Sequence, residues 1–351
     1  MRITIVHSAG DVRAVNALGV GLAAAGHDVA VAVEASPGVF SIEAIATAAG
    51  GADVVLGVAA AGPWAASAAE LAGAVGVVAA LEPTLPTREF APLVKVRPPE
   101  KLNRAVGSVV DTMGWVRAGR DLNRARRELG LGSMGNPFHE LPVLGAWSPT
   151  LVPTPDDWDA ARITVTGEWW LTDGAAWTPD AELEAFLAVG DRPIYVGFGP
   201  TTGSLAEYAL EAILEAWADT YRILLDAGSS RIKGGLPENV HRIDSVPSDW
   251  LFSRCGALVF ECGATRAHAA ARSGIPSIPV PFTPSQRFWG ARLYGADIAT
   301  KPVDPRSGWE AYKAALRTTI ALRDPAKVVA GRIIAEDGVA LAVSTLESLV
   351  R

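Results

Sequence analysis

Residues 258–292 decide the fold of this chain, and they read LVFECGATRAHAAARSGIPSIPVPFTPSQRFWGAR. Leu258 to Phe260 form a short apolar run that is typical of a buried strand, and small residues follow it. An alanine-rich stretch then predicts a helix that Gly274 and Pro276 end. A second apolar strand, Ser277 to Val280, completes a strand–helix–strand unit. In such a unit the turn after the first strand lies where backbone N–H groups and the helix dipole favour an anion.

The same alternation recurs elsewhere in the chain. Ile3 to His7 predict a β-branched strand, and a helix from about residue 12 to 25 and a strand over Val29 to Val33 follow it. Residues 193–199, PIYVGFG, predict another strand that runs into a glycine-rich turn. Strands that alternate with helices are typical of parallel α/β layers, so the chain is expected to hold two Rossmann-like domains.

The composition narrows the class of protein. The 351 residues are 49% apolar and 20% charged, with a net charge of −7, which favours a globular protein and argues against nucleic acid or an anionic membrane as the main partner. The two cysteines have no metal-ligand spacing and indicate a reducing, cytoplasmic setting. The apolar run after Arg2 is too short for a signal peptide, and no uninterrupted apolar stretch predicts a transmembrane segment.

Residues 258–292 resemble the donor-binding signature of the family 1 glycosyltransferases, in the branch of the glycopeptide-antibiotic and sterol glucosyltransferases. The shared positions are Gly274, Pro276, Pro279 to Pro281, Gln286, Ala291 and Arg292. Four positions depart from the signature. Phe260 and Glu261 replace its two histidines, Cys262 replaces its first glycine, and Ser285 replaces the aspartate of its Asp-Gln pair.

The resemblance implies an α/β protein of the GT-B fold, in which two Rossmann-like domains face each other across a cleft. It places a shortened acceptor domain at residues 1–170 and a nucleotide-sugar domain at 171–325. Residues 326–351 would form a helix that packs back on the first domain, and Pro325 is expected to break the helical C-terminal segment.

The resemblance also implies a donor site in the second domain. The residues expected beside the diphosphate are Gly197, Gly199, Thr201, Thr202, Gly263, Ala264, Thr265 and Arg266. Val246 and Ser248 are expected beside the nucleobase, and Ser285 and Gln286 beside the sugar. Because Ser285 replaces a carboxylate that accepts hydrogen bonds from sugar hydroxyls, a deoxysugar is one possible donor.

On the acceptor side, the segment after the first strand resembles the N-terminal motif of the same family through Gly10, Asp11, Ala17 and Leu18. The resemblance implies that Asp11 is the catalytic base, with His7, Ser8 and Trp169 near the acceptor. Two alternatives stay open: Asp11 can instead cap the helix that follows it, and Trp169 can pack at the domain junction.

Two functions remain in competition. The first is inverting transfer of a sugar from a nucleotide diphosphate to a hydroxyl of a hydrophobic natural product, without a metal or another cofactor. The second is a GT-B protein without sugar transfer, whose cleft binds or transforms a secondary metabolite or supports a partner enzyme. The protein is expected to be a monomer or a homodimer.

Overall fold

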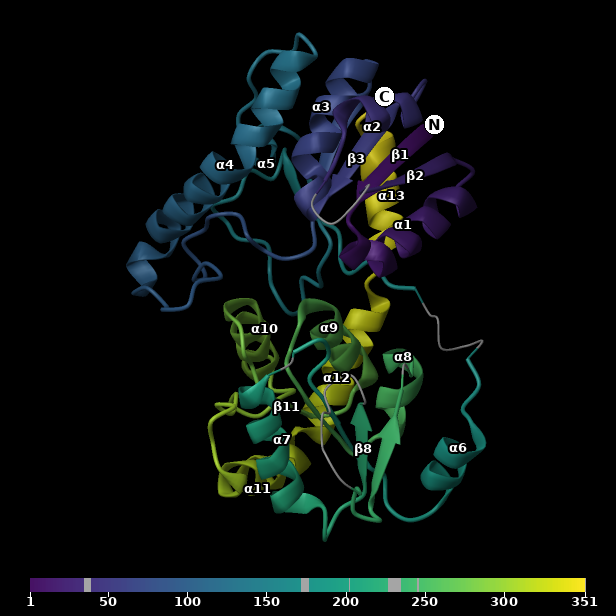
Figure 1. Cartoon of the computed structure of the whole chain (residues 1–351), viewed down its shortest axis with the longest axis vertical. Coiled ribbons are helices and arrows are strands. Elements are labelled where there is room, and N and C mark those ends of the chain that lie inside the picture. The colour runs from purple at the N-terminus through teal and green to yellow at the C-terminus, as the bar shows by residue number, and fades with distance from the viewer. Residues whose placement is uncertain (35–38, 172–176, 202, 227–234, 245, 351) are drawn as a thin grey trace. The chain divides into compact units, whose positions relative to one another are not determined.

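The computed structural model describes residues 1–34, 39–171, 177–201, 203–226, 235–244 and 246–350 (Figure 1). The chain divides into two compact units. Unit 1 comprises Met1–Leu171 and Glu336–Arg351, and unit 2 comprises Thr172–Ala335.

Unit 1 is built on a six-stranded parallel sheet with the order β2-β1-β3-β4-β5-β6. Its strands are β1 (Arg2–His7), β2 (Asp28–Val33), β3 (Val54–Val58), β4 (Val75–Ala80), β5 (Val143–Gly145) and β6 (Ile163–Val165). The continuous β-branched runs of β1 and β3 are buried, as expected of central strands covered on both faces.

The helices of unit 1 include one from the far end of the chain. They are α1 (Val12–Ala24), α2 (Ile42–Ala48), α3 (Gly62–Ala72), α4 (Asn103–Glu128), α5 (Pro137–Glu140) and α13 (Gly338–Ser348). Helix α13, yellow in Figure 1, lies beside α1. A Cβ at Gly21 would overlap Val339, so this glycine permits the close approach of the two helices. The imidazole of His27 also lies 3.0 Å from the carboxylate of Glu347.

Unit 2 is built on a five-stranded parallel sheet with the order β11-β10-β7-β8-β9. Its strands are β7 (Ile194–Gly197), β8 (Ile223–Asp226), β9 (Val240–Ile243), β10 (Ala257–Phe260) and β11 (Ser277–Pro279). Its helices are α6 (Ala181–Ala188), α7 (Ser204–Trp217), α8 (Ser248–Leu251), α9 (Ala264–Ser273), α10 (Pro284–Gly295), α11 (Trp309–Thr318) and α12 (Arg323–Ala335). Gly274 ends α9 in the left-handed conformation, so the predicted strand–helix–strand unit is confirmed.

The C-terminal segment differs from the expectation. The expected break falls at Thr319–Leu322, where a 3-10 turn separates α11 from α12, and Pro325 lies in the first turn of α12, where a backbone N–H has no partner within the helix. Helix α12 packs against α9 within unit 2, and only α13 joins unit 1. The boundary therefore falls at Ala335 and not at residue 325.

Among the described residues, no helix has both the length and the apolar character needed to cross a membrane.

Candidate functional site

A buried polar cluster lies at the carboxyl ends of three neighbouring strands in unit 2. Asp226 ends β8, Gly197 ends β7, and Glu261 directly follows β10. Because β7 lies between β8 and β10 in the sheet, these three ends are adjacent. Arg266 reaches the same edge from the first turn of α9.

Four side chains form the cluster. The Tyr195 hydroxyl donates to Oδ2 of Asp226 at 2.9 Å, and Nη2 of Arg266 donates to the same oxygen at 2.8 Å. Nη1 of Arg266 donates to Oε2 of Glu261 at 3.4 Å. One guanidinium therefore bridges two carboxylates that lie 35 positions apart in the sequence.

Burial controls the charges of this cluster. It raises the pKa of the Glu261 carboxyl, although the nearby Arg266 opposes this shift. Burial alone would lower the pKa of Arg266, but interactions with Tyr195, Glu261 and Asp226 outweigh this effect and raise the pKa above its usual value. The guanidinium therefore stays charged. Burial raises the pKa of Tyr195 well above its usual value, which keeps the hydroxyl protonated as a donor to Asp226. The single cation of the cluster is thus shared between two acids.

The predicted glycine-rich turn lies against this cluster. A Cβ at Gly197 would overlap the Tyr195 hydroxyl and come within 2.8 Å of the Asp226 Cβ. Gly199 has a φ of +56°, and a Cβ there would lie 2.9 Å from Oε1 of Glu261. Both glycines are therefore required by the cluster itself. The backbone N–H of Thr201 donates to the Phe198 carbonyl at 3.0 Å, and Thr202 lies outside the described residues.

The first turn of α9 provides backbone donors beside the cluster. Its N-cap residue, Gly263, is extended and makes no side-chain cap, and its Cα is close enough that a Cβ would lie 3.5 Å from Glu261. Ala264, Thr265 and Arg266 follow, so their N–H groups have no acceptor within the helix. Such a turn can accept an anion, as the sequence predicts.

Cys262 adopts a backbone conformation that favours glycine. Its φ is +64°, in the left-handed region, and its thiol is fully buried. The cysteine therefore stands where the backbone conformation suits the glycine of the family signature.

We expect the free energy of unfolding of Cys262→Gly to exceed that of Cys262→Ala by about 1 kcal/mol. The glycine variant should therefore unfold at a higher urea concentration. Alanine keeps the left-handed strain of about 1–2 kcal/mol and loses the buried sulfur, whereas glycine loses the sulfur and releases the strain. Urea unfolding of the two variants measures the difference. A more stable alanine variant would show that this backbone conformation carries no cost.

The other histidine position, Phe260, is buried and lies near the ring of Phe252. It supplies no polar group to the cluster. His268 in α9 supplies no cation either, because burial lowers the pKa of its imidazole to about 4. Arg266 is therefore the cation that this cluster places in the first turn of α9.

The predicted sugar and nucleobase residues lie on separate elements of unit 2. Gln286 forms a capping box at the start of α10: its Oε1 accepts from the N–H groups of Phe282 and Thr283, and Thr283 accepts in return. Only the amide N–H₂ of Gln286 remains to donate to a sugar. Ser285 is half-buried in the same turn. Val246 is half-buried between β9 and α8, and Ser248 is the half-buried first residue of α8.

In unit 1, His7, Ser8 and Asp11 come together at the carboxyl end of β1. The Ser8 hydroxyl donates to Oδ2 of Asp11 at 2.6 Å, and Nδ1 of His7 lies 2.7 Å from the Ser8 carbonyl. Asp11 precedes α1, but its carboxylate makes no capping bond to this helix. The capping alternative is therefore wrong, and the half-buried carboxylate is available for another role.

Trp169 does not lie near an acceptor surface in unit 1. Its side chain is 2% exposed and packs in the core with residues of β1, β3 and α13. Its indole N–H donates to the Thr166 hydroxyl at 3.0 Å. The structure supports the packing alternative, because a side chain enclosed in the core has no surface to offer an acceptor.

Tyr195 and Asp226 were not predicted as site residues from the sequence. A signal for Asp226 was present, because an ionisable residue at the carboxyl end of a predicted strand lies at the edge where ligands bind in parallel sheets. No such signal marks Tyr195, which lies inside an apolar strand. No group of three or more His, Cys, Asp or Glu side chains that could hold a metal ion occurs in the described part of the chain.

The chain has two α/β units, each built on a parallel sheet with turns at the strand ends that suit a ligand. This architecture defines a protein of the GT-B fold. Solved structures agree. The glycosyltransferase of kitacinnamycin superposes with a TM-score of 0.73 and 17% identity, over 99% of this chain and 98% of that one. The spinosyn forosaminyltransferase has the same score and identity, over 100% and 99% of the two chains.

Similar proteins of known name identify the family to which the chain belongs. A sterol 3-beta-glucosyltransferase of Arabidopsis thaliana is 34% identical over 278 residues, which are 74% of this chain and 43% of the relative. The O-mycaminosyltylonolide 6-deoxyallosyltransferase of Streptomyces fradiae is 35% identical over 233 residues, 64% of this chain and 53% of the relative. The chain thus spans about half the length of these relatives or less, and no protein-family model matches it. It belongs to the family 1 glycosyltransferases of the GT-B fold, in the sterol and antibiotic branch.

Proposed function

We propose that this protein transfers a sugar from a nucleotide diphosphate donor to a hydroxyl of a hydrophobic natural product, with inversion at the anomeric carbon. The observation that carries the proposal is the edge of unit 2, where the glycine-rich turn, the uncapped first turn of α9 and the charged Arg266 adjoin. The relatives support it, because their names describe sugar transfer to sterols and to a macrolide.

In the proposed reaction, Asp11 accepts the proton of the acceptor hydroxyl while the oxygen attacks the anomeric carbon from the face opposite to the diphosphate. The N–H groups of Ala264, Thr265 and Arg266 stabilise the charge that develops as the diphosphate leaves. Ser285 and the amide of Gln286 contact the sugar. A serine offers fewer acceptors than the aspartate of the family signature, so we include a deoxysugar among the donors.

Calorimetric titration with UDP and dTDP, in the presence of a metal chelator, tests the donor half of this proposal. Micromolar affinity for either nucleotide would support it. If neither binds at millimolar concentration, the proposal fails, and the alternative of a GT-B protein without sugar transfer takes its place.

Glu261 is expected to oppose the diphosphate, since a carboxylate about 4 Å from a phosphate charge costs up to about 4 kcal/mol at an effective dielectric of 20. Because burial already raises the pKa of Glu261, an arriving anion raises it further, so binding takes up a proton. Affinity for UDP should therefore fall as the pH rises through the pKa of this group in the free protein.

Glu261→Gln is expected to bind UDP about tenfold more tightly at pH 8 and to lose this pH dependence, because glutamine mimics the protonated acid. Calorimetry in buffers of different ionisation enthalpy measures the proton uptake directly. Glu238→Gln, which changes an exposed acid of the same unit, serves as the matched control. Equal affinities and equal proton uptake in Glu261→Gln and the wild type would contradict the prediction.

A further inference from the structure

Helix α4 presents an apolar stripe to solvent. Val109, Met113 and Val116 are 58%, 68% and 52% exposed, and Leu102 lies just before the helix on the same line. These residues are spaced by seven, four and three positions, so they share one face at about 100° per residue. A row of long apolar side chains in water on a single helix face marks a surface that binds something.

The opposite face of α4 attaches the helix to unit 1. Gly107, Gly119 and Leu122 are buried, and Leu122 belongs to an apolar core that includes residues of α2 and α3. Arg126, also buried, donates to the Glu70 carboxylate at 2.7 Å. The exposed stripe is therefore not a packing face of unit 1, and its substitution should leave the fold intact.

The stripe continues along the helix as a row of arginines. Arg120, Arg124 and Arg127 are exposed, and their spacing of four and three positions keeps them on the line of Val109, Met113 and Val116. The segment from residue 88 to the end of α4 contains ten Lys and Arg residues and five Asp and Glu residues. The whole chain, in contrast, has a net charge of −7. This segment is therefore basic, although the chain as a whole is acidic.

More cations gather at the other end of the stripe. A cavity of about 550 Å³ is lined by Arg88, Glu100, Lys101, Arg104 and Ala105, and the segment before it exposes Lys95, Val96 and Arg97. Val96 is 78% exposed. Apolar and cationic side chains are therefore interleaved here as well.

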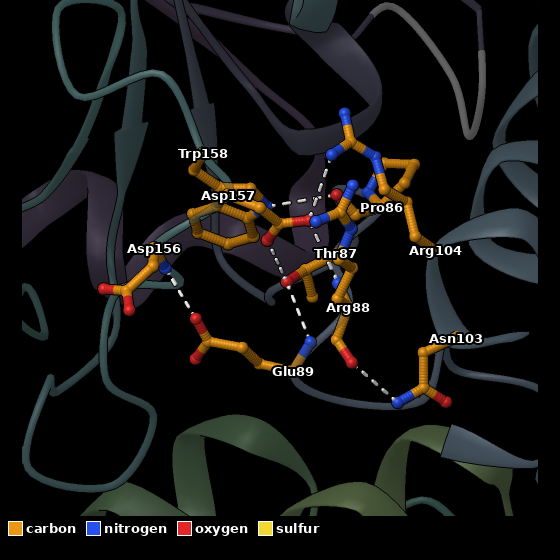
Figure 2. Close-up of polar contacts among 9 residues, drawn as sticks. All are labelled: Pro86, Thr87, Arg88, Glu89, Asn103, Arg104, Asp156, Asp157 and Trp158. Atoms are coloured by element: carbon orange, nitrogen blue, oxygen red, sulfur yellow. Dashed lines mark hydrogen bonds and ion pairs between the residues drawn. The ribbon is translucent and has the colours of Figure 1, made fainter. Parts of the chain in front are cut away.

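Figure 2 shows how the loop before α4 and the Arg104 side chain are held by Asp157. Asp157 accepts from the Thr87 hydroxyl at 2.5 Å, from the Arg88 N–H at 3.1 Å and from Nη1 of Arg104 at 3.3 Å. Asn103 donates to the Arg88 carbonyl at 3.1 Å. This network fastens the loop over residues 86–89 to the first turn of α4, at the end of the helix where the stripe begins.

We propose that the exposed face of α4, with the segment 95–97, docks on the surface of an anionic lipid bilayer. Apolar side chains would enter the boundary between headgroups and acyl chains, while the arginines at one end and Lys95, Arg97 and Lys101 at the other contact lipid phosphates. A second copy of the chain fits less well, because pairing two basic faces brings like charges together. This docking does not depend on sugar transfer.

Flotation of the purified protein with two kinds of vesicle tests the proposal. We expect it to float with vesicles of phosphatidylcholine and phosphatidylglycerol in equal parts and not with phosphatidylcholine alone, and to bind less as salt is raised. Arg120→Gln with Arg124→Gln should weaken binding about fivefold per arginine. Val109→Gln with Met113→Gln should abolish it.

Exposed residues of unit 2 supply the matched controls. Val328→Gln in α12, at a site 57% exposed, and Arg317→Gln in α11 should bind vesicles as the wild type does. Circular dichroism should show the same helical signal for all variants. The proposal is overturned if neither vesicle floats the protein, or if the α4 variants float like the controls. It is also overturned if light scattering finds a dimer that these variants dissociate, since a second copy would then cover the stripe.

Discussion

Arg266→Ala is expected to destabilise unit 2 by about 3–5 kcal/mol, because it leaves two carboxylates in a largely buried site without their shared cation. Asp226 and Glu261 both accept from this guanidinium, and their side chains are 18% and 5% exposed. Glu261 can take up a proton to reduce the cost, since burial already raises its pKa. Urea unfolding, followed by hydrogen exchange of peptides from β7 and β10, reports unit 2 separately from unit 1.

Two further variants distinguish the effect of unpaired carboxylates from non-specific destabilisation of unit 2. Adding Asp226→Asn and Glu261→Gln to Arg266→Ala removes the unpaired charges and should recover at least half of the lost stability. Arg317→Ala, an exposed arginine of the same unit, should unfold like the wild type. An Arg266→Ala variant with an unchanged urea midpoint would show that the cluster contributes nothing to stability.

Because the stability of unit 2 is expected to depend on Arg266, the choice of Arg266 variant matters when nucleotide binding is tested. Loss of UDP binding in Arg266→Ala would report the collapse of the cluster as well as a lost phosphate contact. Arg266→Lys is the better probe, because it keeps a charge near both carboxylates and removes the planar fork that can contact two partners at once. We expect this variant to stay folded and to bind UDP more weakly.

Asp11→Asn is expected to lower kcat for sugar transfer by about 10²–10⁴-fold, the usual contribution of a general base. Asparagine can still accept from the Ser8 hydroxyl, which donates to Asp11 at 2.6 Å, so the end of β1 should keep its shape. The affinity for UDP should stay within about threefold of the wild type, because the proposed diphosphate contacts all lie in unit 2. Product formation with an acceptor found by screening measures the effect.

The control for this variant is Asp28→Asn. Asp28 is an exposed acid of unit 1 that pairs with Arg2 at 3.0 Å, and its substitution should leave kcat unchanged. Turnover of Asp11→Asn at the wild-type rate would remove Asp11 from the mechanism. His7 would then be the next candidate, since the hydrogen bond from its Nδ1 to the Ser8 carbonyl leaves Nε2 of a neutral ring with a free electron pair.

Most of the fold could be predicted because its signals are local. The β-branched runs over residues 3–7 and 29–33 and the glycine at 274 each determine a strand or a helix end through the chain's own short-range geometry. The order of the motifs then identified the GT-B fold. The break assigned to Pro325 falls just before this residue, at Thr319–Leu322, for an equally local reason: proline interrupts a helix interior but is accepted in a first turn.

The candidate site was predicted less completely, because its electrostatics depend on residues that are distant in the sequence. Arg266 and Glu261 are five positions apart, so the sequence by itself places them at the same turn. Asp226 joins them only because β7 separates β8 from β10 in the sheet, which places three strand ends side by side. Tyr195, at the centre of an apolar strand, donates to the same carboxylate.

The residues alone thus specified the alternation of strands and helices, the turn that follows β10 and the family, because these depend on neighbours along the chain. Packing between distant segments decided the rest. It enclosed Trp169 in the core, assigned α12 and α13 to different units, and shared one arginine between two acids. Burial and charge at a site depend on which segments meet, and a linear pattern does not contain that information.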